Sequence, residues 1–229
     1  TLPGGGPEHI FQLLRRLNEN EWKVIICTSN DGSYWLKFNS LGAKTYNLSL
    51  RILSLKTAFK LFFILRKEKP DLIHTHGKGP GLYGRIISSF LNIPTVHTYH
   101  GFHYEDLSTI TKWLHLLLES FLCLLTDHHI FVSAGEKNRT RILKFLDEEN
   151  STVIHNGVDH ESLRTLPITR DTALKLSGVK NWEKNKILGT IARLSPEKGI
   201  LCLLAAFTKA IKETPDLRLI IIGGYPEEH

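Results

Sequence analysis

Short runs rich in β-branched residues alternate with amphipathic stretches along nearly the whole chain. In the first part we expect strands at residues 23–28, 44–48, 71–75, 94–99, 128–133 and 151–155. We expect helices at residues 8–19, 54–69, 82–92, 107–125 and 134–146. Parallel strands require crossover helices, so this alternation predicts an α/β fold with a doubly wound, Rossmann-like parallel sheet and helices on both faces.

A second unit of the same kind follows. It is predicted as a strand at 187–192, a helix at 200–212 and a strand at 217–223. Asn156-Gly157 reads as a turn, and the polar segment 160–184 reads as a connection with a short helix, so the boundary is placed near Asp159.

The glycine loop at 4–6 normally follows a strand, and the second unit holds one βαβ motif, so we expect the chain to be part of a larger protein.

The segment Gly189-Thr-Ile-Ala-Arg193-Leu-Ser-Pro-Glu-Lys198-Gly199 places two basic residues between a strand and a helix. Arg193 and Lys198 lie five residues apart, where a helix beginning near Gly199 presents free N–H groups. In open α/β sheets ligands bind at the carboxyl ends of strands, and this combination suits a diphosphate. The alternative is a pair of ordinary solvated charges.

The composition is that of a globular, reduced protein. The chain has 229 residues, of which 41% are hydrophobic and 23% charged. Its longest apolar stretch, 113–125, is too short to span a bilayer, and no N-terminal signal pattern is present, so we expect a cytoplasmic location. Three cysteines, Cys27, Cys123 and Cys202, are far apart in apolar surroundings and are predicted to be buried thiols.

Much of the net charge of +6 is concentrated between residues 51 and 69. A helix there is predicted to pack on the sheet through an apolar stripe at helical spacing, formed by Leu55, Ala58, Phe59, Phe62 and Leu65. Phe63 and Ile64 are left beside basic residues, which suits either an anionic membrane surface or a solvated face. A nucleic-acid partner is set aside, because the charge lies in one amphipathic helix without a reading motif.

Four segments together resemble glycosyltransferase family 4, of the GT-B fold. They are Gly5-Gly6-Pro7-Glu8-His9, Asp71-Leu-Ile-His-Thr-His76, Ile154-His-Asn-Gly-Val-Asp159 and Ala192-Arg193-Leu-Ser-Pro-Glu-Lys198-Gly199. Residues 76–85 and 97–105 are similar to the branch that builds bacterial exopolysaccharides, capsules, lipopolysaccharide and lipid-linked glycans.

The resemblance implies two Rossmann-like domains: an acceptor-side domain at 1–159, then a linker and the start of a donor-binding domain at 160–229. It implies transfer of a sugar from a nucleotide diphosphate sugar, preferably UDP-linked, to a glycan or polyprenyl-linked acceptor, with retained configuration and no metal or other cofactor. No Asp-x-Asp triplet occurs in the chain. The family's glutamate pair would lie beyond His229, so this stretch alone is expected to be inactive.

The resemblance also assigns residues. Arg193 and Lys198 would neutralise the departing diphosphate, and His100 would contact the donor sugar. The donor side would include Gly5, Gly6 and Gly223. The acceptor side would include His76, Lys78 and Glu105.

Other interpretations stay open. A degenerate, non-catalytic member would bind a nucleotide sugar or glycan only. A metal-dependent hydrolase would use His74 and His76, which share one face of a strand, although no acidic cluster nearby completes a ligand set. Without the resemblance, the histidines at 97, 100 and 103 read as packing residues, and Glu105 and Asp106 as solvated loop acids.

Overall fold

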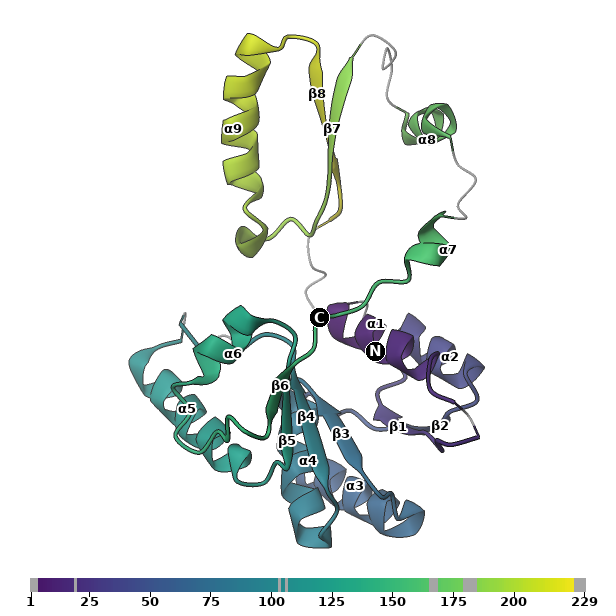
Figure 1. Ribbon diagram of the computed structural model, residues 1–229, viewed down its shortest axis with the longest axis vertical. Helices are drawn as coiled ribbons and strands as arrows, with labels where there is room; N and C mark the ends of the chain where they lie inside the picture. Colours follow the sequence, from purple (N-terminus) through teal and green to yellow (C-terminus); the bar gives the residue numbers. More distant parts are fainter. Residues whose placement is uncertain are drawn as a thin grey trace. The chain divides into compact units, whose positions relative to one another are not determined.

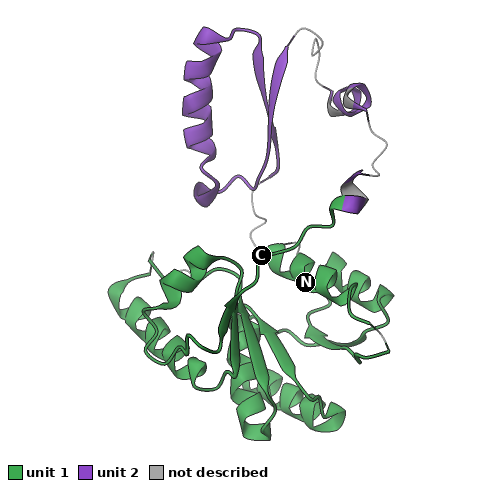
Figure 2. Cartoon of the chain, viewed as in Figure 1, with its two compact units in different colours: residues 1–160 green, residues 161–229 purple. Residues whose placement is uncertain are grey.

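The chain forms two compact units, residues 1–160 and 161–229 (Figure 2). The computed structural model describes residues 4–18, 20–102, 104–105, 107–164, 169–178 and 185–224.

Within its described residues, unit 1 alternates strands and helices (Figure 1). Its strands are β1 (Ile25–Thr28), β2 (Lys44–Asn47), β3 (Ile73–His76), β4 (Thr95–Tyr99), β5 (His128–Phe131) and β6 (Ser151–Val153). Its helices are α1 (Gly5–Leu14), α2 (Ser33–Ser40), α3 (Leu55–Glu68), α4 (Lys78–Leu91), α5 (Thr109–Cys123) and α6 (Ala134–Thr140). All strand pairings are parallel, as the alternation predicted.

The strands form the orders β1-β2 and β3-β4-β5-β6. In the second group His76 pairs with Thr98, so the end of β3 lies beside the end of β4, two residues before His100. Parallel pairing therefore brings these histidines to the same sheet edge.

A cavity of about 140 Å³ lies between β1 and β3, under α3. Its walls include Ile25 and Cys27 of β1, Ile73 of β3, and Leu61 and Leu65 of α3. Within the described residues β1 and β3 are not hydrogen-bonded to each other. The strand expected before the glycine loop stays a prediction.

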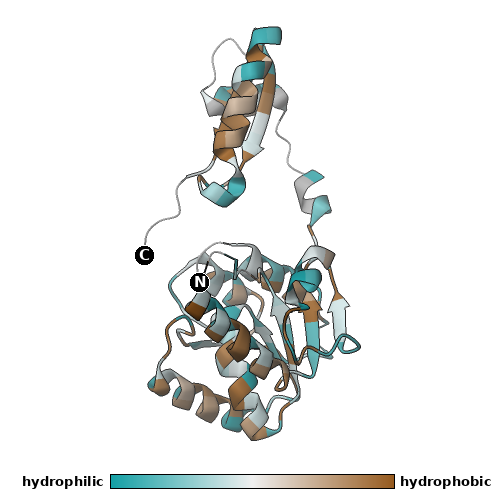
Figure 3. Cartoon of the chain, turned by 90° about the vertical axis from the view of Figure 1, so that its left-hand side faces the viewer, coloured by the Kyte–Doolittle hydropathy of each residue, from teal (hydrophilic) through white to brown (hydrophobic). Residues whose placement is uncertain are grey.

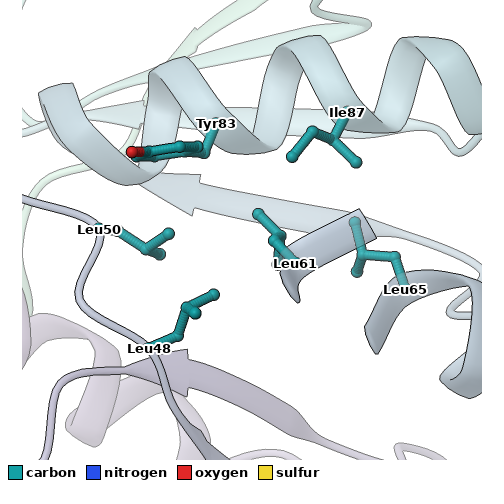
Figure 4. Packing of buried hydrophobic residues seen from close by; sticks show 6 residues of the cluster. All are labelled: Leu48, Leu50, Leu61, Leu65, Tyr83 and Ile87. Atoms are coloured by element: carbon teal, nitrogen blue, oxygen red, sulfur yellow. The ribbon is translucent and has the colours of Figure 1, made fainter. Parts of the chain in front are cut away.

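A hydrophobic core joins α3 and α4 to the chain after β2 (Figure 4). It consists of Leu48, Leu50, Leu61, Leu65, Tyr83 and Ile87. The Tyr83 hydroxyl donates to the Ile52 carbonyl oxygen at 2.8 Å, so the polar group of this buried side chain has a hydrogen-bond partner.

The predicted inward stripe of α3 is wrong at two positions. Leu55 and Phe59 are 79% and 63% exposed. The stripe that packs inward instead runs through Ala58, Leu61, Phe62 and Leu65, which also have helical spacing. The hydrophobic surface of α3 is therefore larger than predicted.

Two further differences concern α2 and α6. Helix α2 was not predicted; it is anchored by buried Tyr34 and Phe38. Helix α6 ends at Thr140 instead of reaching residue 146. Beyond it the Lys144 amide donates to Ser120 Oγ at 3.2 Å, and Leu143 joins the core cluster around Tyr99 and Phe131, so tertiary packing replaces the last turns.

Unit 2 contains two parallel strands, β7 (Lys186–Ile191) and β8 (Leu217–Ile222), and the helix α9 (Ile200–Glu213). Two short helices precede them: α7 (His160–Arg164), which begins at the last residue of unit 1, and α8 (Arg170–Ser177). Figure 3 shows that the first turns of α9 are hydrophobic and its end hydrophilic.

No residue of α9 is buried, and Cys202 on its first turn is exposed, so the prediction of three buried thiols is wrong there. The reason is that α9 contacts little beyond β8, which leaves its outer face uncovered. Cys123 is buried and Cys27 half-buried, and all three are free thiols. In the described part of the chain, no helix combines the length and the hydropathy that a membrane span requires.

Candidate functional site

Four imidazoles gather where β3 and β4 end, and we call them the histidine cluster: His9, His74, His76 and His100. His9 comes from α1, His74 and His76 from β3, and His100 follows β4. The Nδ1 atom of His76 and the Nε2 atom of His100 lie 3.1 Å apart, a hydrogen bond. The His9 ring packs edge-on against His100, with 5.1 Å between ring centroids, and the His74 ring lies 4.1 Å from that of His76.

Burial keeps the cluster neutral. Desolvation, together with a smaller effect of neighbouring imidazoles, lowers the pKa of His74 and of His100 to about 4. Burial also depresses the pKa of His76 well below its usual value, and that of His9 less strongly. At neutral pH these rings are therefore hydrogen-bonding groups that both donate and accept, and they are not cations.

The glycine loop packs directly on the cluster. A Cβ atom at Gly6 would lie 3.8 Å from the His100 ring, so the start of α1 covers that imidazole. The loop after His100 is fixed from the other side, because the Gly101 amide donates to the carboxylate of Glu136. Glu136 lies in the first turn of α6, whose N-cap is Ser133.

Beside the cluster lies a cavity of about 230 Å³. It is lined by Gly77, Lys78, His97, Tyr99, His100, Gly101, Phe102 and Glu119. Lys78 is exposed at the first position of α4, so a cation and a helix N-terminus meet a neutral imidazole at the same opening. The arrangement suits a polar ligand with hydroxyl or anionic groups.

Glu119, which lines this cavity, belongs to a buried ion pair with Arg85. Arg85 is fully buried; its Nη2 donates to Glu119 Oε2 at 2.9 Å, and its Nε donates to the Gly81 carbonyl oxygen at 2.9 Å. His97 is buried next to it, with Nδ1 2.7 Å from Thr75 Oγ1. His97 is thus a packing residue in the wall of the cavity.

The start of the chain is also tied to the turn that ends unit 1. His9 makes a side-chain hydrogen bond to Asn156. Asp159 pairs with Arg15 at 3.2 Å and with Arg16 at 3.8 Å. The family-like segments at residues 5–9 and 154–159 therefore meet at α1.

In unit 2 the basic motif forms the turn between β7 and α9. Gly199 caps α9 with a φ of 63°, a left-handed conformation that favours glycine. Arg193 Nη2 bonds Glu197 Oε1 at 3.1 Å, and both side chains are more than half exposed. Exposed pairs of this kind contribute less than about 1 kcal/mol, so the bond between Arg193 and Glu197 costs little to break.

Gly223 is explained by packing. A Cβ atom there would overlap the carbonyl oxygen of Ala192, where β8 ends beside β7. Only glycine permits this close approach, which holds the turn after β7 against the end of β8.

The predicted site residues divide between the units. Unit 1 brings His76, Lys78 and His100 together, with Gly6 on His100 and Gly5 beginning α1. Glu105 does not line the cavity; it is half exposed and lies 3.7 Å from Arg139. Arg193, Lys198 and Gly223 belong to unit 2. The positions 103 and 106 lie outside the described residues.

Two site residues were not predicted. His9 is part of the quoted glycine segment, but nothing in its spacing links it to histidines of β3 and β4. Glu197 stands four residues after Arg193, but Arg193 precedes the short 3-10 turn Pro196–Lys198, so the helical spacing rule does not apply to this pair. Neither residue therefore carried a usable sequence signal.

Comparison with known proteins gives the family. The model of Glycosyltransferase Family 4 matches residues 3–162, more than half of the chain. The chain belongs to glycosyltransferase family 4. An Escherichia coli family relative, UDP-Gal:alpha-D-GlcNAc-diphosphoundecaprenol alpha-1,3-galactosyltransferase, is 32% identical over 77% of this chain and 46% of its own length.

A human relative, one of the subunits of phosphatidylinositol N-acetylglucosaminyltransferase, is 29% identical over 98% of this family 4 chain and 46% of its own length. The chain thus spans about half the length of these relatives. Anabaena HepE, solved with UDP and glucose, has a TM-score of 0.75 at 18% identity, over 98% of this chain and 59% of that one. This likeness confirms the predicted α/β, Rossmann-like GT-B fold.

Proposed function

We propose that the chain supplies the acceptor-side domain, residues 1–159, and the start of the donor-binding domain, residues 160–229, of a retaining glycosyltransferase. Its donor is a nucleotide diphosphate sugar, by preference a UDP-sugar, and its acceptor a glycan carried on a polyprenyl-type lipid. The product belongs to cell-surface polysaccharide synthesis, at the cytoplasmic face of the membrane. Turnover requires no metal ion.

The observation that carries this proposal is membership of glycosyltransferase family 4 over residues 3–162. The name of the E. coli relative specifies a UDP-sugar donor and a diphosphoundecaprenol-linked acceptor. The human relative is named for transfer to a phosphatidylinositol lipid, so both names describe acceptors attached to lipid.

The chemistry of the site agrees with this reaction. When the bond between the sugar and the diphosphate breaks, negative charge grows on the diphosphate, and Arg193 and Lys198 are the cations that offset it in place of a metal. The acceptor hydroxyl then bonds to the sugar carbon on the face that the diphosphate leaves, and its proton passes to the departing diphosphate oxygen. Neutral His100 hydrogen-bonds a sugar hydroxyl, while Lys78 at the cavity opening binds the acceptor side.

Helix α3 is the first surface proposed to meet the membrane. Its exposed side chains combine hydrophobic Leu55, Phe59 and Phe63 with basic residues such as Lys60. Its one acidic residue, Glu68, is bound to Lys44 at 2.7 Å. The exposed face therefore carries positive charge and apolar groups, the combination that binds anionic lipid surfaces.

Helix α5 supports the same placement. It exposes an apolar stripe of Ile110, Trp113, Leu114, Leu117, Leu118 and Phe121, each between 41% and 75% exposed. Its single acidic residue, Glu119, is buried against Arg85. An apolar stripe without acidic neighbours, with Lys112 beside Trp113, suits the boundary between lipid headgroups and acyl chains.

The test is calorimetric titration of UDP-, GDP- and ADP-sugars into the full-length gene product in EDTA, followed by transfer assays with a lipid-linked acceptor. We expect UDP-sugar binding, which Arg193→Ala weakens by about 1.5 to 3 kcal/mol, or more than tenfold. Lys209→Ala, an exposed lysine of α9, is the matched control and should bind like the parent protein.

Four results would count against parts of the proposal. Absence of nucleotide-sugar binding would refute the donor site. Binding without transfer would favour the non-catalytic alternative, and inverted product configuration or a requirement for a divalent cation would refute the mechanism.

A further inference from the structure

Three members of the histidine cluster present nitrogen atoms to a common point. One ring nitrogen from each of His9, His76 and His100 lies within 4.8 Å of the other two. The Nδ1 atom of His76 and the Nε2 atom of His100 are 3.1 Å apart. Two imidazole nitrogens bound to one tetrahedral zinc ion are separated by about 3.3 Å, so this pair already has the spacing of two ligands.

The third ligand needs only a small adjustment. His9 has to approach by at most about 1.5 Å, the difference between 4.8 Å and 3.3 Å, which side-chain rotation supplies. Its ring is half-buried on α1 and restrained by Asn156, so it already faces the other two. His74 is held apart, because its Nε2 is 2.7 Å from Thr98 Oγ1.

The donor set selects the class of ion. It consists of imidazoles without a carboxylate, whereas Mg²⁺, Ca²⁺ and Mn²⁺ prefer oxygen ligands. Zn²⁺, Co²⁺, Ni²⁺ and Cu²⁺ accept three imidazoles and leave a further coordination position to water. Binding of such an ion does not require the acidic cluster near β3 that a hydrolase would need.

We propose that His9, His76 and His100 bind one late first-row transition-metal ion of the Zn²⁺ class, and that this ion inhibits sugar transfer. The bound ion takes up a ring nitrogen of His100 and occupies the space next to Gly6. The inhibitory part rests on the proposed function, in which His100 contacts the donor sugar. The binding part stands on the three imidazoles alone.

The binding test uses untagged, EDTA-treated full-length protein, titrated with Zn²⁺ against a chromophoric chelator and separately with Co²⁺. We expect one Zn²⁺ per chain and the intense visible absorption of tetrahedral Co²⁺. His9→Gln should weaken Zn²⁺ binding by more than about tenfold, the lower end of the loss caused by removing an outer contact of a metal ligand. His100→Gln should do the same.

The matched control is His128→Gln. His128 lies on β5 outside the cluster, with Nε2 2.9 Å from Thr152 Oγ1, and its loss should leave the Zn²⁺ affinity unchanged. Equal affinity in the parent protein and in His9→Gln, or an equal loss in His128→Gln, would overturn the site. Circular dichroism of each variant verifies folding.

The inhibition test adds Zn²⁺ to the transfer assay. A fall in rate that follows the Zn²⁺ occupancy, and that His9→Gln shifts to higher Zn²⁺ concentration, supports the inhibitory role. Unchanged turnover at full occupancy overturns inhibition and leaves the site intact. A protein without transferase activity still gives the binding result, so failure of the proposed function is distinguishable from failure of the metal site.

Discussion

The ion pair beside the cavity gives a quantitative test of how the site is supported. Arg85 is fully buried and the Glu119 side chain is 7% exposed, so both charges are largely removed from bulk water. Replacing Arg85 by Met leaves the Glu119 carboxylate buried without its partner. Breaking such a pair costs about 3 to 5 kcal/mol of unfolding free energy, because the remaining charge is desolvated and uncompensated.

A second substitution separates this desolvation cost from loss of packing. In Arg85→Met/Glu119→Leu both charges are absent, and apolar side chains occupy the space. The double variant should therefore recover to within about 1 kcal/mol of the parent protein. The control is Arg141→Met, which removes an ion pair of similar length, 3.1 Å to Glu148, but with both side chains more than half exposed. It should cost less than about 1 kcal/mol.

The assay is urea unfolding at pH 7.5, monitored by tryptophan fluorescence and far-UV circular dichroism, with the slope m compared among variants. A cost below about 1 kcal/mol for Arg85→Met would show that water reaches Glu119. A double variant as unstable as the sum of the single ones would show that packing, and not charge, dominates. Either result refutes the reasoning.

Two further predictions concern pH and lipid. The unfolded chain protonates histidine below pH about 6.5, whereas folded His74 and His100 do so only near pH 4, so stability should fall as the pH drops between these values. The slope is at most about 1.4 kcal/mol per pH unit for each ring, less where solvent screens it; urea midpoints measure it, and a constant midpoint would contradict it. In vesicle co-sedimentation, Lys60→Gln should weaken binding to anionic vesicles about fivefold and Lys209→Gln in unit 2 should not. Equal binding to zwitterionic vesicles would exclude the charge contribution.

The fold was predictable because alternating strands and helices leave few ways to bury both faces of a parallel sheet. Helix α2 was missed because it is short and is stabilised by tertiary contacts. Tyr34 is buried and its hydroxyl donates to Glu8 of α1 at 2.6 Å. A pattern confined to the segment itself does not contain that information.

The site was predictable only where neighbouring strands place it. His76 ends β3 and His100 follows the paired strand β4, so parallel register brings them together, and their hydrogen bond agrees with that reasoning. His9 reaches the same point from a helix far earlier in the chain. Its contact depends on how α1 packs, which local periodicity does not encode. The paired state of Arg193 with Glu197 likewise follows from the turn geometry.

The bond between His9 and Asn156 has a mechanical consequence. Asn156 lies in the segment through which the chain leaves unit 1, just before unit 2 begins after His160. A ligand that rotates the His9 ring changes its hydrogen bond to Asn156. Ligand binding at the histidine cluster and the conformation of the segment around Asn156 are therefore thermodynamically linked. One hydrogen bond transmits about 1 kcal/mol, which corresponds to roughly a fivefold change in conformer populations.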